Sequence, residues 1–152
     1  MAASAWLVHD AAKEMVGNKF IDFDNDTFYM VLGLSTSNMH AVTTAGYANI
    51  TDEVATNFGY TQGLVVDNII TNNSWSASGS VMTWDSDDVV WTADGGSITA
   101  RYAAVVDDIP TTPTADPIIC SSLLDTAPAD VQATDGNTFT VQINVAGIFT
   151  LA

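Results

Sequence analysis

Basic side chains are almost absent from this 152-residue sequence. Lys13, Lys19 and Arg101 are the only bases, against 18 acidic residues, and the formal net charge is −15. Binding to the phosphate backbone of a nucleic acid depends on clustered Lys and Arg, so we expect no nucleic-acid partner. Proteins that mimic DNA charge usually carry dense carboxylates on helices, whereas most acids here lie among β-like segments. The acidic surface therefore serves solubility or meets a basic partner.

Cysteine and long hydrophobic runs are also scarce. Cys120 is the only cysteine and lies in the apolar run DPIICSSLL, so we expect no internal disulfide and a buried thiol. No apolar stretch reaches the roughly 18 residues that span a bilayer, which predicts no membrane partner. The first residues lack the basic start and the long apolar core of a secretory signal. We therefore expect a protein that is made in a reducing compartment.

Motifs of known catalytic and cofactor sites are missing as well. The sequence has no Gly-rich phosphate loop, no dinucleotide fingerprint and no G-x-S-x-G nucleophile turn. His9 and His40 are the only histidines, and their spacing fits no zinc motif. We therefore expect that the protein is not an enzyme and binds no cofactor or metal.

An acidic stretch between two tryptophans, TWDSDDVVWT, offers two interpretations. Asp85, Asp87 and Asp88 could supply the carboxylate pair of a glycosidase, and sugar could stack on Trp84 and Trp91. Most tryptophans in β-strands, however, belong to a core or an interface. We favour the second interpretation.

A second acidic stretch, IDFDNDTFYMVL, begins at position 21. Its alternating aspartates resemble the ligands of a calcium loop, but an EF-hand that starts at Asp22 would need Gly where Thr27 stands and Glu where Gly33 stands. Asp and Asn also form turns by accepting hydrogen bonds from their own backbone. We expect Asp22–Asp26 to be a polar turn that leads into a strand, with a looser cation site as the alternative.

Hydrophobic residues make up 47% of the chain, which is enough for a sizeable core. The pattern predicts one short helix over residues 4–17, with Ser4 as N-cap, followed only by short β-like segments. Turn signals lie at 92–97 (TADGGS) and 134–137 (TDGN) and predict hairpins. The predicted strands are Phe28–Leu34, Leu64–Thr71, Ser80–Trp84, Val89–Thr92, Ser97–Val106, Pro117–Leu124 and Thr138–Val145. We therefore predict a mainly β fold: a single β-sandwich or jelly-roll-like domain over residues 20–152, preceded by an N-terminal helical segment over residues 1–19.

Arg101 is the only base after position 19 and lies within the apolar segment ITARYAAVV. Burial of an unpaired guanidinium is very costly, so we expect an ion pair. Asp87 and Asp88, one predicted hairpin away, are the candidate partners. The pair could form within one subunit or between two subunits.

An ordered set of short motifs resembles a family of small structural proteins of tailed bacteriophages. The matching residues are Asp26, Thr27 and Phe28; Glu53 and Val54; Gly59, Tyr60 and Thr61; Asp88, Val89 and Trp91; Ala100, Arg101, Tyr102 and Ala103; and Gly147 and Phe149. The resemblance covers most of the chain. It implies a virion component that is assembled in the host cytoplasm, and within that class we favour a capsid decoration or cement protein on the capsid surface.

The resemblance also implies partners, namely the major capsid protein and other copies of the chain in a trimer or dimer. We expect the N-terminal segment and the loop Ser35–Asp52 to reach a neighbour, with Trp6 as an anchor because interface hot spots favour Trp. The predicted contact residues are Trp6, Val8, Met15, Met39 and Tyr47. The alternative function is a tail-associated or fibre-base module that recognises a host surface or glycan.

Overall fold

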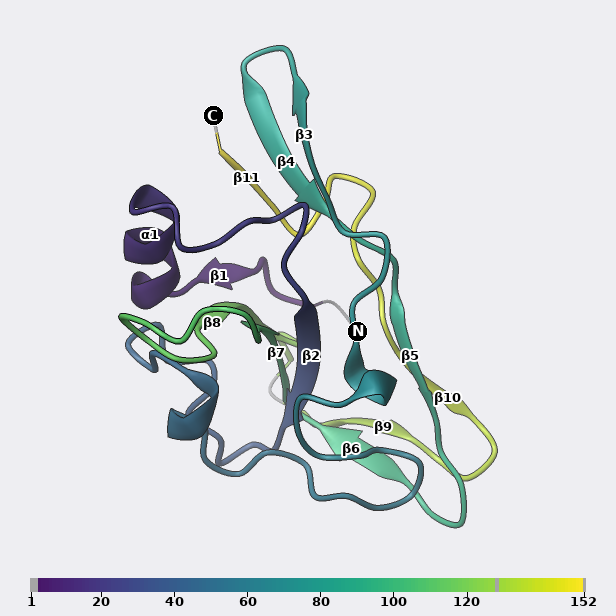
Figure 1. Cartoon of the computed structure of the whole chain (residues 1–152). Coiled ribbons are helices and arrows are strands. Elements are labelled where there is room, and N and C mark those ends of the chain that lie inside the picture. Colours follow the sequence, from purple (N-terminus) through teal and green to yellow (C-terminus); the bar gives the residue numbers. More distant parts are fainter. Residues whose placement is uncertain (1–2, 128, 152) are drawn as a thin grey trace.

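The computed structural model describes residues 3–127 and 129–151. The chain is mainly β, with 36% of its residues in strands and 9% in helices, which confirms the predicted fold class. In chain order the elements are β1 (Leu7–Val8), α1 (Asp10–Gly17), β2 (Phe28–Gly33), η1 (Tyr47–Asn49), η2 (Val66–Asn68), β3 (Ser74–Ser78), β4 (Val81–Asp85), β5 (Val89–Thr92), β6 (Ile98–Ala100), β7 (Tyr102–Asp107), β8 (Ile118–Leu123), β9 (Val131–Ala133), β10 (Thr138–Val141) and β11 (Phe149–Leu151). Figure 1 shows their arrangement.

The main sheet is antiparallel and has the strand order β1-β8-β7-β2. Its central strands are buried on both faces because successive side chains alternate between two cores. In β2, Met30 and Leu32 belong to the larger core, whereas Val31 belongs to a smaller one. The smaller core includes Met39, from the loop that follows β2. This two-sided burial explains why the strands read as continuous apolar runs.

A two-stranded ribbon forms the layer opposite the main sheet. β5 pairs with β10, and β6 pairs with β9, both antiparallel. The ribbon contributes Trp91, Ile98 and Phe139 to the larger core, which also contains Leu32 and Val105 of the main sheet. The arrangement is sandwich-like, as the sequence predicts.

The turns at 92–97 and 134–137 are not hairpins, because each joins two strands that pair with different partners. The two turns lie side by side. Ala93 N donates to Asn137 O (2.9 Å), and Gly136 N donates to Ala93 O (2.8 Å). Both strands of the ribbon therefore bend at the same place, at the lower right of Figure 1.

A third sheet, of order β11-β4-β3, carries an aromatic cluster beside the main core. Trp84 is fully buried, with its ring centroid 4.8 Å from that of Phe28 and 4.9 Å from that of Phe23. Phe149, from β11, joins the same cluster. The C-terminal strand is thereby fixed to the core.

The N-terminal segment differs from its prediction as a helix over 4–17. Ser4 N donates to Leu123 O (2.8 Å), and β1 pairs with β8, so the helix begins only at Asp10. His9 is its N-cap residue, in an extended conformation. The edge of β8 offers backbone partners that a helix would leave unused, and this tertiary pairing outweighs the modest local preference for a helix.

Three predicted strands also differ from those observed. Residues 64–71 contain the 3-10 helix η2 and a single bridge from Ile69 to Tyr29 instead of a strand. The segment 97–106 is divided at Arg101, where the chain passes from the ribbon to the main sheet. The last predicted strand ends at Val141, and Val145 is 99% exposed.

Gly59 packs directly on the bend of the ribbon, where Phe58 O accepts a hydrogen bond from Asp94 N (3.2 Å). Gly59 has a φ of +87°, and a Cβ there would collide with the carbonyl oxygen of Thr92. Gly79 also has a positive φ, +65°, but a Cβ there would meet nothing within 4 Å. A comparison of the same substitution at the two glycines therefore separates the cost of backbone strain from the cost of a steric collision.

We predict that Gly59→Ala lowers the free energy of unfolding by about 3 kcal/mol or more, because strain and collision add. Gly79→Ala should cost only about 1–2 kcal/mol, the cost of a left-handed residue alone. Urea unfolding monitored by tryptophan fluorescence measures both. Equal losses would show that Gly59 is not sterically restricted.

Candidate functional site

Arg101 forms its ion pair with Asp130, so the prediction of Asp87 or Asp88 as partner is wrong. Arg101 Nε lies 2.7 Å from Asp130 Oδ1, and the two side chains are 18% and 42% exposed. Asp130 directly precedes β9, the strand that pairs with β6. The ion pair therefore lies within one subunit and joins the two strands of the ribbon where one of them enters the main sheet.

Asp87 and Asp88 have other roles, and both are exposed. Asp87 Oδ2 accepts hydrogen bonds from Asn72 Nδ2 (2.6 Å) and Thr71 Oγ1 (3.2 Å). Asp88 Oδ1 accepts from Ile143 N (2.8 Å). These carboxylates hold loops to the ends of strands, a long-range pairing that short sequence spacing does not reveal.

Trp84 and Trp91 are core residues, as we favoured, with exposed fractions of 0% and 3%. Trp91 Nε1 donates to Asn68 Oδ1 (2.9 Å), which is itself buried. Neither indole offers a face on which a sugar could stack.

Asp22–Asp26 form the predicted polar turn. Asp22 Oδ1 accepts from the backbone N–H groups of Asp24 (3.1 Å) and Asn25 (3.2 Å), and Asp22 N donates to Asp26 Oδ2 (2.6 Å). Hydrogen bonds from the Asn25 amide and from these N–H groups lower the pKa of Asp22. Asp24 Oδ1 accepts from Trp75 N (2.8 Å), which ties the turn to β3.

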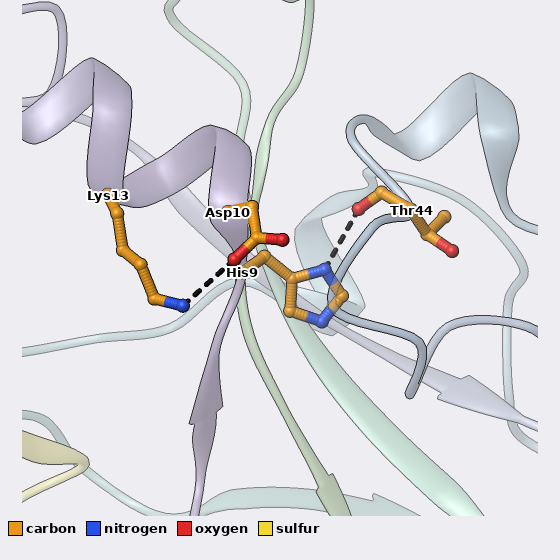
Figure 2. A network of polar contacts seen from close by, with 4 residues as sticks. All are labelled: His9, Asp10, Lys13 and Thr44. Atoms are coloured by element: carbon orange, nitrogen blue, oxygen red, sulfur yellow. Dashed lines mark hydrogen bonds and ion pairs between the residues drawn. The ribbon is translucent and has the colours of Figure 1, made fainter.

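The two histidines meet at Ser121, a cluster that their separation in sequence conceals. His9 Nδ1 lies 2.8 Å from Thr44 O (Figure 2), and His9 Nε2 lies 2.9 Å from Ser121 Oγ. A carbonyl can only accept, so His9 Nδ1 carries the proton and Nε2 accepts from the serine hydroxyl. His40 Nδ1 lies 3.2 Å from the same hydroxyl.

This cluster has a structural role. Burial lowers the pKa of both histidines, and His9 and Ser121 are fully buried. Neither residue lines the groove beside Trp6 or the smaller hollow beside α1 and β11. A buried serine that no substrate can reach is not a nucleophile, and the hydrogen bonds instead attach the start of α1 to β8 and to the loop around Thr44.

Met15 and Met39 were predicted to contact a partner, and this prediction is wrong because both side chains are buried within the chain. Their exposed fractions are 1% and 0%. Met15 lies on the buried face of α1, and Met39 packs closely against Gly33 within the smaller core. Moderate amphipathicity and a loop position did not distinguish inward from outward orientation.

Tyr47 is half-buried, and its hydroxyl is engaged within the chain. It donates to Glu53 Oε2 (2.6 Å), and Tyr60 Oη donates to Glu53 Oε1 (2.8 Å). Burial, followed by the nearby Glu53 carboxylate, raises the pKa of both tyrosines far above the usual value. The loop after β2 is therefore held to the sheet, because Tyr60 Oη also accepts from Leu32 N (3.0 Å).

Trp6 and Val8 are half-buried, and Trp6 lines a large groove of about 860 Å³. None of the groove residues carries an ionisable side chain, although the chain has 21 Asp, Glu, Lys and Arg residues (18 + 3). The lining is formed by Ala3, Ser4, Ala5, Trp6, Ser122, Leu124, Val131, Phe139, Thr140, Val141, Gln142, Ile143, Asn144, Gly147, Ile148 and Phe149. This uncharged groove is the candidate interaction site.

The groove runs between residues 3–6, which directly precede β1, and β10 with the residues that follow it. β1 is an edge strand of the main sheet, and β10 pairs only with β5 among the described strands. β5 contributes nothing to the lining, so the groove lies along the other edge of β10. His9 N donates to Ile119 O (3.0 Å), and alternation in an antiparallel ladder then directs the backbone groups of Val8 and Trp6 away from β8. Such edges bind extended peptides.

No protein-family model, no curated protein and no solved structure matches the chain. Within residues 3–127 and 129–151, no helix is both long and apolar enough to cross a membrane. The same residues contain no group of three His, Cys, Asp or Glu side chains arranged to hold a metal ion.

Asp107 is a fully buried carboxyl at the end of β7. Its Oδ1 accepts from Ile109 N (3.1 Å), whereas Oδ2 has no partner among the described residues. Burial, with a further contribution from the nearby Asp26, raises the pKa of Asp107 to about 8. Asp107 therefore stays protonated up to about pH 8 in the folded protein, whereas it loses its proton near pH 3.8 in the unfolded chain.

We predict that the contribution of Asp107 to the free energy of unfolding falls as pH rises from about 4 to about 8, because Asp107 stays protonated in the folded state and not in the unfolded state in this window. Asp107→Asn, which imitates the protonated acid, should remove this contribution and stabilise the protein at pH 8 by about 1–3 kcal/mol relative to the wild type. Urea unfolding at several pH values tests this. Asp52→Asn, at an exposed site, is the matched control, and an unchanged slope in Asp107→Asn would contradict the prediction.

A double-mutant cycle tests the observed ion pair. Arg101→Met and Asp130→Asn should show a coupling energy of about 0.5–1 kcal/mol, because Asp130 remains partly solvated. Arg101→Met combined with Asp88→Asn should be additive within about 0.5 kcal/mol. Chemical unfolding of the wild type, the three single variants and the two double variants supplies the energies. Coupling to Asp88 alone would restore the sequence-based pairing.

Proposed function

We propose that the chain is a structural virion protein of a tailed bacteriophage, specifically a capsid decoration or cement protein that binds the shell of the major capsid protein. The observation that carries the proposal is the uncharged groove between residues 3–6, directly before β1, and the open edge of β10. The resemblance of the ordered motifs to phage structural proteins supports the same class. On this proposal the protein acts on the capsid surface as a trimer or dimer.

The groove suits a polypeptide partner in an extended conformation. A strand laid along β10 would form backbone hydrogen bonds with groups on the edge that faces away from β5. Trp6 lies in the wall of the groove and can cover such a strand. Because no lining side chain is ionisable, the contact would bury no unpaired charge.

Charge also favours this surface as the contact. Copies with a net charge of −15 repel one another when they are concentrated on a shell. Contacts made through an uncharged groove keep the acidic side chains in solvent, where salt screens them. The acids then oppose non-specific association without weakening the specific contact.

The proposed mechanism is thermodynamic. A protein that binds the expanded shell, and not its disassembled subunits, stabilises the shell by mass action, by about 2.7 kcal/mol per site at a free concentration of 100 times Kd. Many copies together would resist the pressure of packaged DNA.

Co-sedimentation tests the proposal. Purified protein is mixed with expanded shells that have been stripped of it and, separately, with isolated tails. Saturable binding to shells, with greater resistance of the shells to heat, is expected. Binding to tails or to host glycans in its place would support the alternative of a tail-associated recognition module.

We predict that Thr140→Glu weakens binding to shells at least tenfold, since it introduces a charge into the groove. Thr138→Glu is the matched control, because Thr138 is exposed on the same strand but does not line the groove. Circular dichroism verifies folding. Equal affinities of the two variants would contradict a role for the groove.

A further inference from the structure

We propose that Asp26 and Asp107 bind a hard divalent cation, calcium in preference to magnesium, where β2 begins and β7 ends. The inference does not depend on the proposed function, because neither residue lines the uncharged groove. It departs from the expectation of no bound metal, which rested on local motifs, because the two aspartates are far apart in the sequence. A cation here would join the acidic turn before β2 to the loop that follows β7.

The register of the main sheet brings the two carboxyl groups together. Phe28 is opposite Asp107 in the antiparallel ladder, and the pairing continues one step further, where Asp108 N donates to Thr27 O (3.1 Å). Asp26, two residues before Phe28, is therefore a diagonal neighbour of Asp107. The two side chains also interact directly, because Asp26, after burial, raises the pKa of Asp107 both by its charge and by a hydrogen bond.

Asp107 has an oxygen atom that no protein donor satisfies. Its side chain is fully buried, and its Oδ1 accepts from Ile109 N (3.1 Å). No N–H or hydroxyl group of residues 3–127 and 129–151 donates to its Oδ2. Buried polar atoms without a partner are rare in folded proteins, because nothing offsets the loss of their hydration. We therefore expect a ligand at Oδ2.

Asp26 differs from the other aspartates of the acidic turn. The oxygens of Asp22 accept three hydrogen bonds from within the turn, and Asp24 Oδ1 accepts from Trp75 N (2.8 Å). Asp26 Oδ2 accepts from Asp22 N (2.6 Å), which leaves Asp26 Oδ1 for a cation. Asp26 is only half-buried, so a cation can reach the pair from solvent.

The negative charge at this end of the sheet exceeds what one proton can neutralise. Asp108, like Asp26, adds to the effect of burial in raising the pKa of Asp107, and it adds to the effect of burial on the pKa of Asp116. None of the three bases of the chain contributes to these two shifts. A proton shared by Asp26 and Asp107 neutralises one charge, whereas a divalent cation between them neutralises two.

The chemistry of the ligands selects the cation. Carboxylate oxygens suit calcium and magnesium rather than zinc or copper. A cation that contacts the buried Oδ2 of Asp107 must lose water on that side, and magnesium loses its water reluctantly. Calcium is therefore favoured. The pair supplies only two side-chain ligands, so water must complete the coordination, and we expect a Kd of about 0.1–1 mM.

Calcium titrations of the full-length protein test the site at about pH 8, where protons compete least. Isothermal titration calorimetry of calcium-depleted protein should show one site per chain, and the midpoint of thermal unfolding should rise with the calcium concentration. About 0.1 M NaCl is included to screen diffuse attraction by the net charge. Magnesium chloride at the same concentrations should have a smaller effect, and a larger effect would overturn the choice of calcium.

Four substitutions locate the site. Asp107→Asn and Asp26→Asn should each weaken calcium binding at least tenfold, and Asp107→Asn is expected to fold because it imitates the protonated acid. Asp24→Asn, in the same turn, and Asp52→Asn, at another exposed site, remove the same charge and should bind calcium as the wild type does. The inference is overturned if the wild type shows no saturable binding or if all four variants bind equally. It is also overturned if Asp24→Asn alone loses binding, since the cation would then lie within the acidic turn.

Hydrogen exchange supplies a second readout. Calcium should slow the exchange of Ile109 N–H, which donates to Asp107 Oδ1, and of Asp108 N–H, which donates to Thr27 O. The exposed turn at Gly79 should exchange at an unchanged rate. Absence of protection at Asp108 and Ile109 in calcium-saturated protein would contradict a site at Asp107.

Discussion

Burial of the main sheet on both faces is the constraint on which the rest of the structure depends. Both faces of β2, β7 and β8 are buried only if the remaining chain packs one layer against each face. The ribbon and the third sheet cover one face, and the loop after β2 covers the other. The Glu53 hydrogen bonds to Tyr47 and Tyr60 hold that loop in place. The open edges of β1 and β10 are what remains when both covers are complete.

The central strands could be predicted from the sequence because their pattern reflects burial. Val89–Thr92 has the predicted bounds, and Phe28–Gly33 differs by one residue. The missed strands β1, β3, β9 and β11 are short and lie at edges, where tertiary pairing decides the conformation more than local pattern does. The acidic turn and the buried tryptophans were predicted for the same reason as the central strands, since local hydrogen bonding and hydrophobicity determine them.

The candidate site was much less accessible to sequence reasoning. The Arg101–Asp130 pair and the meeting of His9 and His40 at Ser121 depend on the three-dimensional path of the chain. Met15 and Met39 were chosen by residue type and position, and both proved to be buried. The uncharged groove collects residues from both ends of the chain, so no continuous segment could indicate it.

The pairing of β1 with β8 has a consequence for how the protein is made. Leu7 is opposite Ser121, so strands separated by more than a hundred positions must find one another. Contacts of this kind are formed late and slowly, because a long loop must be closed before the sheet gains their energy. During synthesis the N-terminal strand has no partner until β8 has left the ribosome. Residues 3–6, which directly precede β1 and line the groove, are therefore among the last parts to order, and the groove exists only once nearly the whole chain has folded.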